Sequence, residues 1–237
     1  MVTGRRCGTL AAMSLKNTVF EERGFAIVGG VLSAEACDTI AAGVRADAVS
    51  GGARGLLNQP WCVELAETLL RHGELSGLIP DGHLAVQCTF FEKSRDHNWL
   101  VPIHQDLSIP VAARVDEPGL GAWSTKDGAL FVQAPVALLE QLVVVRVHLD
   151  DCMAEDGPLR VVPGSHRHGI LSTEIAAQVR QVQPEVTCEA ALGSALVMRP
   201  LLLHASSKGV GGSRRRVLHF VFGPASLSHG LQWKHAA

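Results

Sequence analysis

QLVVVRVHL, residues 141–149, is the stretch that decides the fold class. Every odd position from 143 to 149 is valine or leucine, whereas the even positions include Arg146 and His148. A period of two with one wholly apolar face is typical of a β-strand. Arg146 and His148 fit either the interior of a β-domain or its hydrated outer face.

Further short segments on both sides of this stretch also have the composition of strands. They are residues 84–91, 159–162, 195–198, 201–205 and 217–222. Turn signals such as Asp156-Gly157 separate them. Because no regular alternation of strands with helices occurs in this half of the chain, the pattern argues against a parallel-sheet nucleotide fold and suggests a sandwich or barrel.

The first 80 residues are predicted to be mostly helical. Ser33 suits an N-cap, and apolar residues follow it at helical spacing up to position 48. Pro60 suits the first position of a second helix, and Gly73 suits its end. We expect one domain over residues 1–237, with helical support in 1–80, a β-core in 81–223 and an insertion at 111–140 that could cover an active-site mouth.

Composition excludes several classes of protein. The formal net charge of −2 gives no footprint for nucleic acid or an anionic membrane. No apolar run approaches the roughly 20 residues of a membrane span, and the N-terminal 13 residues lack the apolar core of a signal peptide. The six cysteines form no C-x-x-C pair, so we expect reduced thiols in a cytoplasmic protein.

The sharpest chemical signal is His104-Gln105-Asp106. In an extended segment, residues i and i+2 point the same way, so His104 and Asp106 could bind one ion. His204, at the end of an apolar run, is the best third ligand. Two histidines and one carboxylate leave coordination positions open for a chelating substrate and O₂, which is the arrangement of non-haem Fe(II) oxygenases.

Three arginines follow His204 after ten to twelve residues, at positions 214–216. Arginine binds a carboxylate with two parallel hydrogen bonds. A dicarboxylate that chelates iron through one end would present its other carboxylate to such an arginine. This combination favours a dicarboxylate co-substrate.

Two rival interpretations remain open at this point. His166 and His168, with Glu174 downstream, resemble the ligands of cupins, although the gap is long and Pro163-Gly164 favours a turn. The chain could also be a non-catalytic binding protein on the same scaffold.

The chain resembles the phytanoyl-CoA dioxygenase family over roughly residues 20–223. The resemblance is carried by the motif at 104–107 (HQDL), by GPL at 157–159 leading to PGSH at 163–166, by HAS at 204–206, and by Arg215. It implies a mainly β fold with flanking helices, namely a double-stranded β-helix (jelly-roll, cupin-like) core wrapped by N-terminal helices. It also implies hydroxylation of a small organic substrate with Fe(II), 2-oxoglutarate and O₂, which releases succinate and CO₂.

The resemblance places the metal ligands on His104, Asp106 and His204. It places the arginine that binds 2-oxoglutarate on Arg215, and a supporting hydroxyl on Ser206. Because Asp106 is present, a hydroxylase is favoured over a halogenase, in which a small residue replaces the carboxylate ligand. The chain departs from the family pattern in having no tyrosine, and nothing in it identifies a coenzyme A pocket.

Other site residues are expected on weaker grounds. Gln87 and Thr89 share one face of an early strand and could reach 2-oxoglutarate. Gln105, Trp99 and Trp123 are candidates for substrate contacts, although tryptophans at such positions suit a core equally well. Lys93 and Arg95 are interpreted as solvated.

Overall fold

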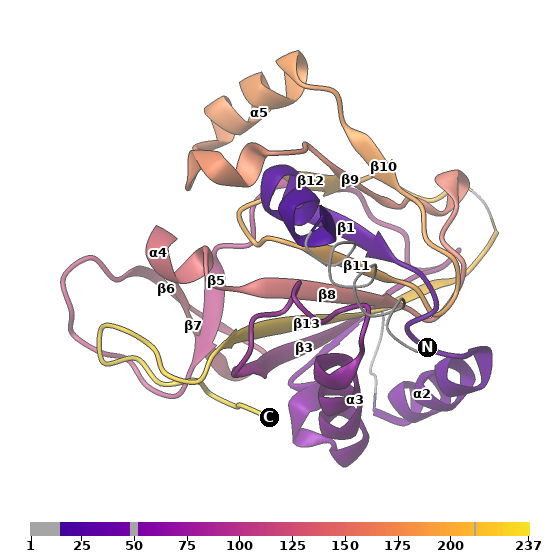
Figure 1. The fold of residues 1–237 in the computed structure, drawn as a ribbon, viewed down its shortest axis with the longest axis horizontal. Helices are drawn as coiled ribbons and strands as arrows, with labels where there is room; N and C mark the ends of the chain where they lie inside the picture. Colours follow the sequence, from indigo (N-terminus) through magenta and orange to yellow (C-terminus); the bar gives the residue numbers. More distant parts are fainter. Residues whose placement is uncertain (1–14, 48–51, 211) are drawn as a thin grey trace, which may run out of the picture.

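The computed structural model describes residues 15–47, 52–210 and 212–237, which form three antiparallel sheets with helices on two sides (Figure 1). The N-terminal 13 residues and position 48, about which the sequence makes predictions, lie outside the described residues. In the described part of the chain, none of the helices has the length and apolar character needed to cross a membrane.

The largest sheet has six strands in the order β1-β11-β8-β13-β3-β2. Their bounds are β1 Phe25–Val28, β11 Ala195–Met198, β8 Val143–His148, β13 Arg215–Pro224, β3 His83–Lys93 and β2 Gly52–Arg54. The stretch 141–149 thus supplies a central strand, which pairs with β11 on one side and β13 on the other. All six residues of β8 are buried, because both faces of this sheet are covered.

A second sheet has four strands in the order β10-β9-β12-β4. Their bounds are β10 Val186–Cys188, β9 Leu159–Val161, β12 His204–Ser206 and β4 Val101–His104. One apolar cluster joins the two sheets, with Val144, Leu196 and Val221 from the large sheet and Leu159 and Val161 from the small one. Two facing antiparallel sheets of this order make the expected double-stranded β-helix.

The opposite face of the large sheet is covered by helices α2 (Ala34–Asp47) and α3 (Pro60–Arg71), which lie together on one side of the molecule (Figure 1). The alternate residues of β8 and β13, among them Val145 and Phe220, pack against them. Ser33 caps α2 by accepting a hydrogen bond from Ala36 N at 3.2 Å, and Pro60 opens α3, as predicted. Helix α5 (Thr173–Val182) lies on the other side of the molecule (Figure 1).

The segment 111–140 contains a hairpin, β6 (Gly121–Lys126) and β7 (Ala129–Gln133), and the short helix α4 (Val136–Leu139). The hairpin joins β5 (Ser108–Val111) in a three-stranded sheet of order β5-β7-β6. The predicted insertion is therefore structured, and its outer strand carries Lys126 toward the cavity described below.

Several local predictions differ from the structure. β1 and β2, within the first 80 residues, are strands of the large sheet that the sequence analysis missed. The predicted strand at 201–205 is a turn up to position 203, and strand pairing begins only at His204. Helix α5 was also not predicted, because its amphipathic pattern sits on a polar background.

Candidate metal centre

Strand pairing brings His104 and His204 together from positions 100 residues apart. β12 pairs with β4 in a register that places His204 opposite His104, and the two imidazole centroids are 4.1 Å apart. Pairing of this kind fixes the two rings through the backbone. His104 and His204 are therefore held together by strand pairing although they are far apart in the sequence.

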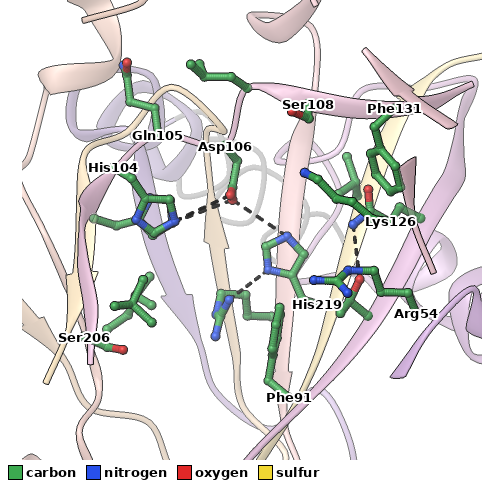
Figure 2. Close-up of a pocket in the computed structure, with 18 of the residues that line it drawn as sticks. Arg54, Phe91, His104, Gln105, Asp106, Ser108, Lys126, Phe131, Ser206 and His219 are labelled. Carbon is green, nitrogen blue, oxygen red and sulfur yellow. Dashed lines mark hydrogen bonds and ion pairs between the residues drawn. The ribbon is translucent and has the colours of Figure 1, made fainter. Parts of the chain in front are cut away.

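Asp106 follows β4 directly and completes the group. Its backbone N–H donates to Pro200 O at 2.9 Å, which ties the residue to the turn that precedes β12. Its Oδ1 lies 3.9 Å from His104 Nε2, and its Oδ2 lies 3.7 Å from His204 Nε2. Among the described residues, these three side chains are the group whose ligand atoms, all within 4.8 Å of one another, could hold a metal ion (Figure 2).

The tautomers of the two histidines are set by backbone carbonyls. His104 Nδ1 lies 2.9 Å from Pro102 O, and His204 Nδ1 lies 2.8 Å from Leu202 O. A carbonyl oxygen can only accept a hydrogen bond, so each Nδ1 carries the proton and each Nε2 presents a lone pair to the centre. Burial lowers the pKa of His204 to about 4 against the opposing charge of Asp106, which keeps this ring neutral and ready to bind a metal.

His219, on β13, has the opposite tautomer. Arg146 Nη1 donates to His219 Nδ1 at 2.8 Å, so the proton of this imidazole lies on Nε2. That Nε2–H faces Asp106 Oδ2 from 3.9 Å (Figure 2). Because its Nε2 carries a proton, His219 offers no lone pair to the centre and is not a fourth metal ligand, and at 3.9 Å it makes no hydrogen bond to the carboxylate.

The carboxylate of Asp106 is held in its anionic form. Burial alone would raise its pKa, but electrostatic attraction to His204, His219 and His104 when these rings are protonated lowers the pKa below its usual value. Its Oδ2 is nevertheless buried without a hydrogen-bond partner in the described structure. A buried anionic oxygen without a donor is a costly arrangement unless a cation binds there.

The arginine triplet is divided by the alternation of the strand. Arg214 binds Glu92 at the surface through two hydrogen bonds, and Arg216 makes a bidentate pair with Asp150. Arg215 points the other way, is 4% exposed, and has no carboxylate partner among the described residues. Its Nη1 donates to Gly157 O, and its Nε has no acceptor.

Lys93 occupies the position directly opposite Arg215 in the pairing of β3 with β13. It is 3% exposed, which corrects the prediction that it is solvated. Its ammonium donates to Ser206 Oγ at 2.9 Å and to Ser207 O at 2.6 Å. Burial, and then the charges of Arg215 and Arg146, lower the pKa of Lys93 to about 8.

A cavity of about 540 Å³ connects the metal centre with these cations. Of the residues predicted for the site, most line it: His104, Asp106, His204, Ser206, Arg215, Gln87, Thr89, Gln105 and Trp99. Trp123 does not, because it lies at a separate recess where the Arg114 guanidinium stacks over its ring at 5.2 Å.

The remaining predicted residues differ in what their side chains do. The Gln105 amide points away from the metal centre (Figure 2) and binds the backbone of Gly169, Leu171 and Leu201, so it holds loops in place. Gln87 Nε2 donates to Thr89 Oγ1 at 3.2 Å. Both face the cavity, on the part of β3 remote from Lys93.

The rival cupin-like site is not assembled. The residues Ser165–His168 form a short 3₁₀ turn, as Pro163-Gly164 suggested. His166 Nε2 lies 3.1 Å from Glu21 O, and neither His166 nor His168 lines the cavity. Within the described part of the chain, neither of them joins a metal-compatible group.

Three buried cavity residues escaped the sequence analysis as site residues: Lys93, Arg146 and His219. The alternation in β8 and β13 left Arg146 and His219 on faces that could be interior or exterior, and Lys93, at the end of β3, was interpreted as solvated. The register of strand pairing is the feature that places them in the cavity. Arg146 pairs with His219, which shares its strand face with Arg215.

The comparison with known families decides the classification. The sequence profile of the family described as Phytanoyl-CoA dioxygenase matches residues 20–217. The chain belongs to the phytanoyl-CoA dioxygenase family. No curated protein sequence matches it at a significant level.

Three solved structures share the fold at 17–22% sequence identity. AviO1 from Streptomyces viridochromogenes Tue57 has a TM-score of 0.62 and 22% identity, over 90% of this chain and 96% of that one. EctD from S. alaskensis has a TM-score of 0.67 and 17% identity, over 92% and 79%. HygX from Streptomyces hygroscopicus, solved with nickel and 2-oxoglutarate, has a TM-score of 0.60 and 18% identity, over 87% and 84%.

We predict that metal binding depends on His204 and not on His166 or His168. His204→Ala should abolish stoichiometric binding of Fe(II) or Ni(II), because it removes one of three ligands. The double variant His166→Asn/His168→Asn should bind one ion per chain, as the unmodified protein does. Anaerobic titration calorimetry measures both. Loss of the ion in the double variant with retention in His204→Ala would place the site at the 3₁₀ turn.

Proposed function

We propose that this protein is an Fe(II)- and 2-oxoglutarate-dependent oxygenase that hydroxylates a small organic substrate. The observation that carries the proposal is the convergence of two imidazole lone pairs on a carboxylate whose Oδ2 is buried without a partner. This donor set fits Fe(II). HygX with nickel and 2-oxoglutarate, and the epimerase SnoN with Fe³⁺ and alpha ketoglutarate, share this fold and support the choice of cofactors.

The residues around the centre have separate roles in this proposal. His104, Asp106 and His204 would hold the iron at the wall of the cavity. The iron and 2-oxoglutarate, when bound, supply O₂ activation coupled to oxidative decarboxylation, with one oxygen atom passing to succinate and one to the substrate. His219, held by Arg146, directs its Nε2–H toward Asp106 Oδ2 from 3.9 Å, beyond hydrogen-bond distance.

The distal carboxylate of 2-oxoglutarate would bind Arg215, with Lys93 and Ser206 beside it. Arg215 and Lys93 are buried like charges at opposed positions, and such a pair destabilises an empty strand ladder. A carboxylate between them neutralises this repulsion. Hydrogen bonds to charged groups contribute about 1.5–3 kcal/mol each. Arg215 and Lys93 together can therefore favour a diacid strongly over a monoacid that lacks the second carboxylate.

The direct test of the proposal is turnover of the co-substrate. With Fe(II) and O₂, the purified protein should convert 2-oxoglutarate to succinate and CO₂, slowly without substrate and faster with it. Asp106→Ala should reduce this conversion to background, because it removes the anionic ligand. Succinate is measured by chromatography. Conversion by Asp106→Ala at the unmodified rate would contradict the assignment of the centre.

Arg215→Lys should raise the apparent KM for 2-oxoglutarate at least about tenfold, equivalent to about 1.4 kcal/mol, because lysine keeps the charge but loses the planar fork. Arg214→Lys is the matched control: its side chain binds Glu92 at the surface, so its KM should change little. Arg216→Lys should likewise leave KM nearly unchanged while it lowers stability by weakening the pair with Asp150. Ser206→Ala should raise KM by less than Arg215→Lys. If the KM for 2-oxoglutarate rose in Arg214→Lys and not in Arg215→Lys, the assignment of the strand faces would be wrong by one residue.

Lys93→Met should weaken 2-oxoglutarate binding by about tenfold yet raise the free energy of unfolding of the ligand-free protein. The physical reason is that methionine fills the space without a buried charge opposite Arg215. Exposed Lys208→Met is the control and should change neither quantity. Urea unfolding with and without 2-oxoglutarate measures both effects. A Lys93→Met protein that is less stable and binds the diacid normally would rule out the role given to this ammonium.

A further inference from the structure

The cavity is far more basic than the protein as a whole. Its lining contains five cationic side chains, at Arg54, Lys93, Lys126, Arg146 and Arg215. Within the described part of the chain, Asp106 is the one carboxylate that lines it. The formal net charge of the full chain is −2, so the positive charge of this cavity is a local feature.

The proposed cofactors do not neutralise this charge. Fe(II) brings two positive charges, Asp106 one negative charge and 2-oxoglutarate two negative charges, which leaves a single negative charge. Arg215 alone balances it. Arg146, which is 6% exposed, then remains without an anion, and its Nε has no acceptor in the described structure. Burial, and then the charge of Arg215, lower the pKa of Arg146 to about 10, so the side chain still carries its charge at neutral pH.

Two of the cations lie apart from the proposed 2-oxoglutarate site. Figure 2 shows Lys126 and Arg54 reaching into the cavity from the side opposite His104, with His219 between. Arg54 is the strand partner of Thr89, four residues along β3 from Lys93. At about 3.3 Å per residue, its backbone therefore lies about 13 Å along the strand direction from that of Lys93. Arg54 is thus placed toward the other end of the cavity from the Arg215–Lys93 pair.

Lys126 is the uncompensated charge on this side. Arg54 Nη1 already binds Asp127 Oδ2 at 2.6 Å, which fixes the turn of the β6–β7 hairpin against β2. In the described structure Lys126 has no carboxylate within ion-pair distance, and its ammonium lies 4.9 Å from the centre of the Phe131 ring. The flat apolar ring of Phe131 thus adjoins the Lys126 ammonium, which has no carboxylate partner in the described structure. The Arg54 nitrogens that do not bind Asp127 are on the same side of the cavity.

We propose that the substrate is an organic acid whose anionic group binds Lys126 and Arg54, while its apolar part lies along Phe131 toward the metal centre. This inference rests on the proposed function, because it identifies the class of molecule that this oxygenase accepts. The second anion site selects acids over their neutral analogues by charge. Arg146, which lines the same cavity, adds positive potential that favours the same class.

The test compares acids with their own amides on the protein loaded with Fe(II) and saturating 2-oxoglutarate without O₂. Suitable pairs are benzoate and benzamide, phenylacetate and phenylacetamide, and hexanoate and hexanamide. Perturbation of the visible charge-transfer absorption of the iron chelate reports binding beside the metal, and loss of that absorption reports displacement of 2-oxoglutarate. At least one acid should bind at least about tenfold more tightly than its amide without displacing 2-oxoglutarate.

Lys126→Gln should remove the preference for the acid, and Lys126→Arg should retain it. Arg114→Gln makes the same change of charge at an exposed arginine outside the cavity and should keep the preference. Amides that bind as tightly as acids, no binding by any acid, or a preference that survives in Lys126→Gln would each overturn the inference. If the charge-transfer absorption never forms, the proposed function fails instead, and thermal shifts with the same pairs still test the anion site.

Discussion

The antiparallel pairing of β12 with β4 is the constraint on which the site depends. It sets His204 opposite His104, and the turn before β12 accepts the backbone N–H of Asp106. The backbone carbonyls of Pro102 and Leu202 then fix the imidazole protons on Nδ1. The three candidate metal ligands thus converge on one strand pair and the turn tied to it.

The same sheets bring together buried cations whose mutual repulsion opposes folding. Lys93 faces Arg215, and Arg146 stacks 5.6 Å over the Phe91 ring while it donates to His219. His148 lies among them and is neutral, because burial and the charges of Arg146 and Arg215 lower its pKa to about 3. Buried cations that lower stability are expected where a fold binds anions, because binding sites are often less stable than the rest of a protein.

Sequence alone predicted much of the core and less of the site. Alternation identified β8, and a short apolar run identified β11, whereas β1 and the three-residue β2 lie in the part of the chain predicted to be helical. The candidate metal ligands were predicted because a histidine and a carboxylate at i and i+2 need only one strand. Lys93, Arg146 and His219 were missed because their placement depends on which face of a strand is interior, and that is a property of the paired sheet.

The most direct measurement is anaerobic addition of 2-oxoglutarate to the Fe(II)-loaded protein, followed by visible absorption. The account predicts a charge-transfer band that saturates at one 2-oxoglutarate per iron, since the diacid would chelate the metal while its far carboxylate binds Arg215. Binding of 2-oxoglutarate without the band, or no binding at all, would contradict it and leave a metal-binding scaffold without this co-substrate.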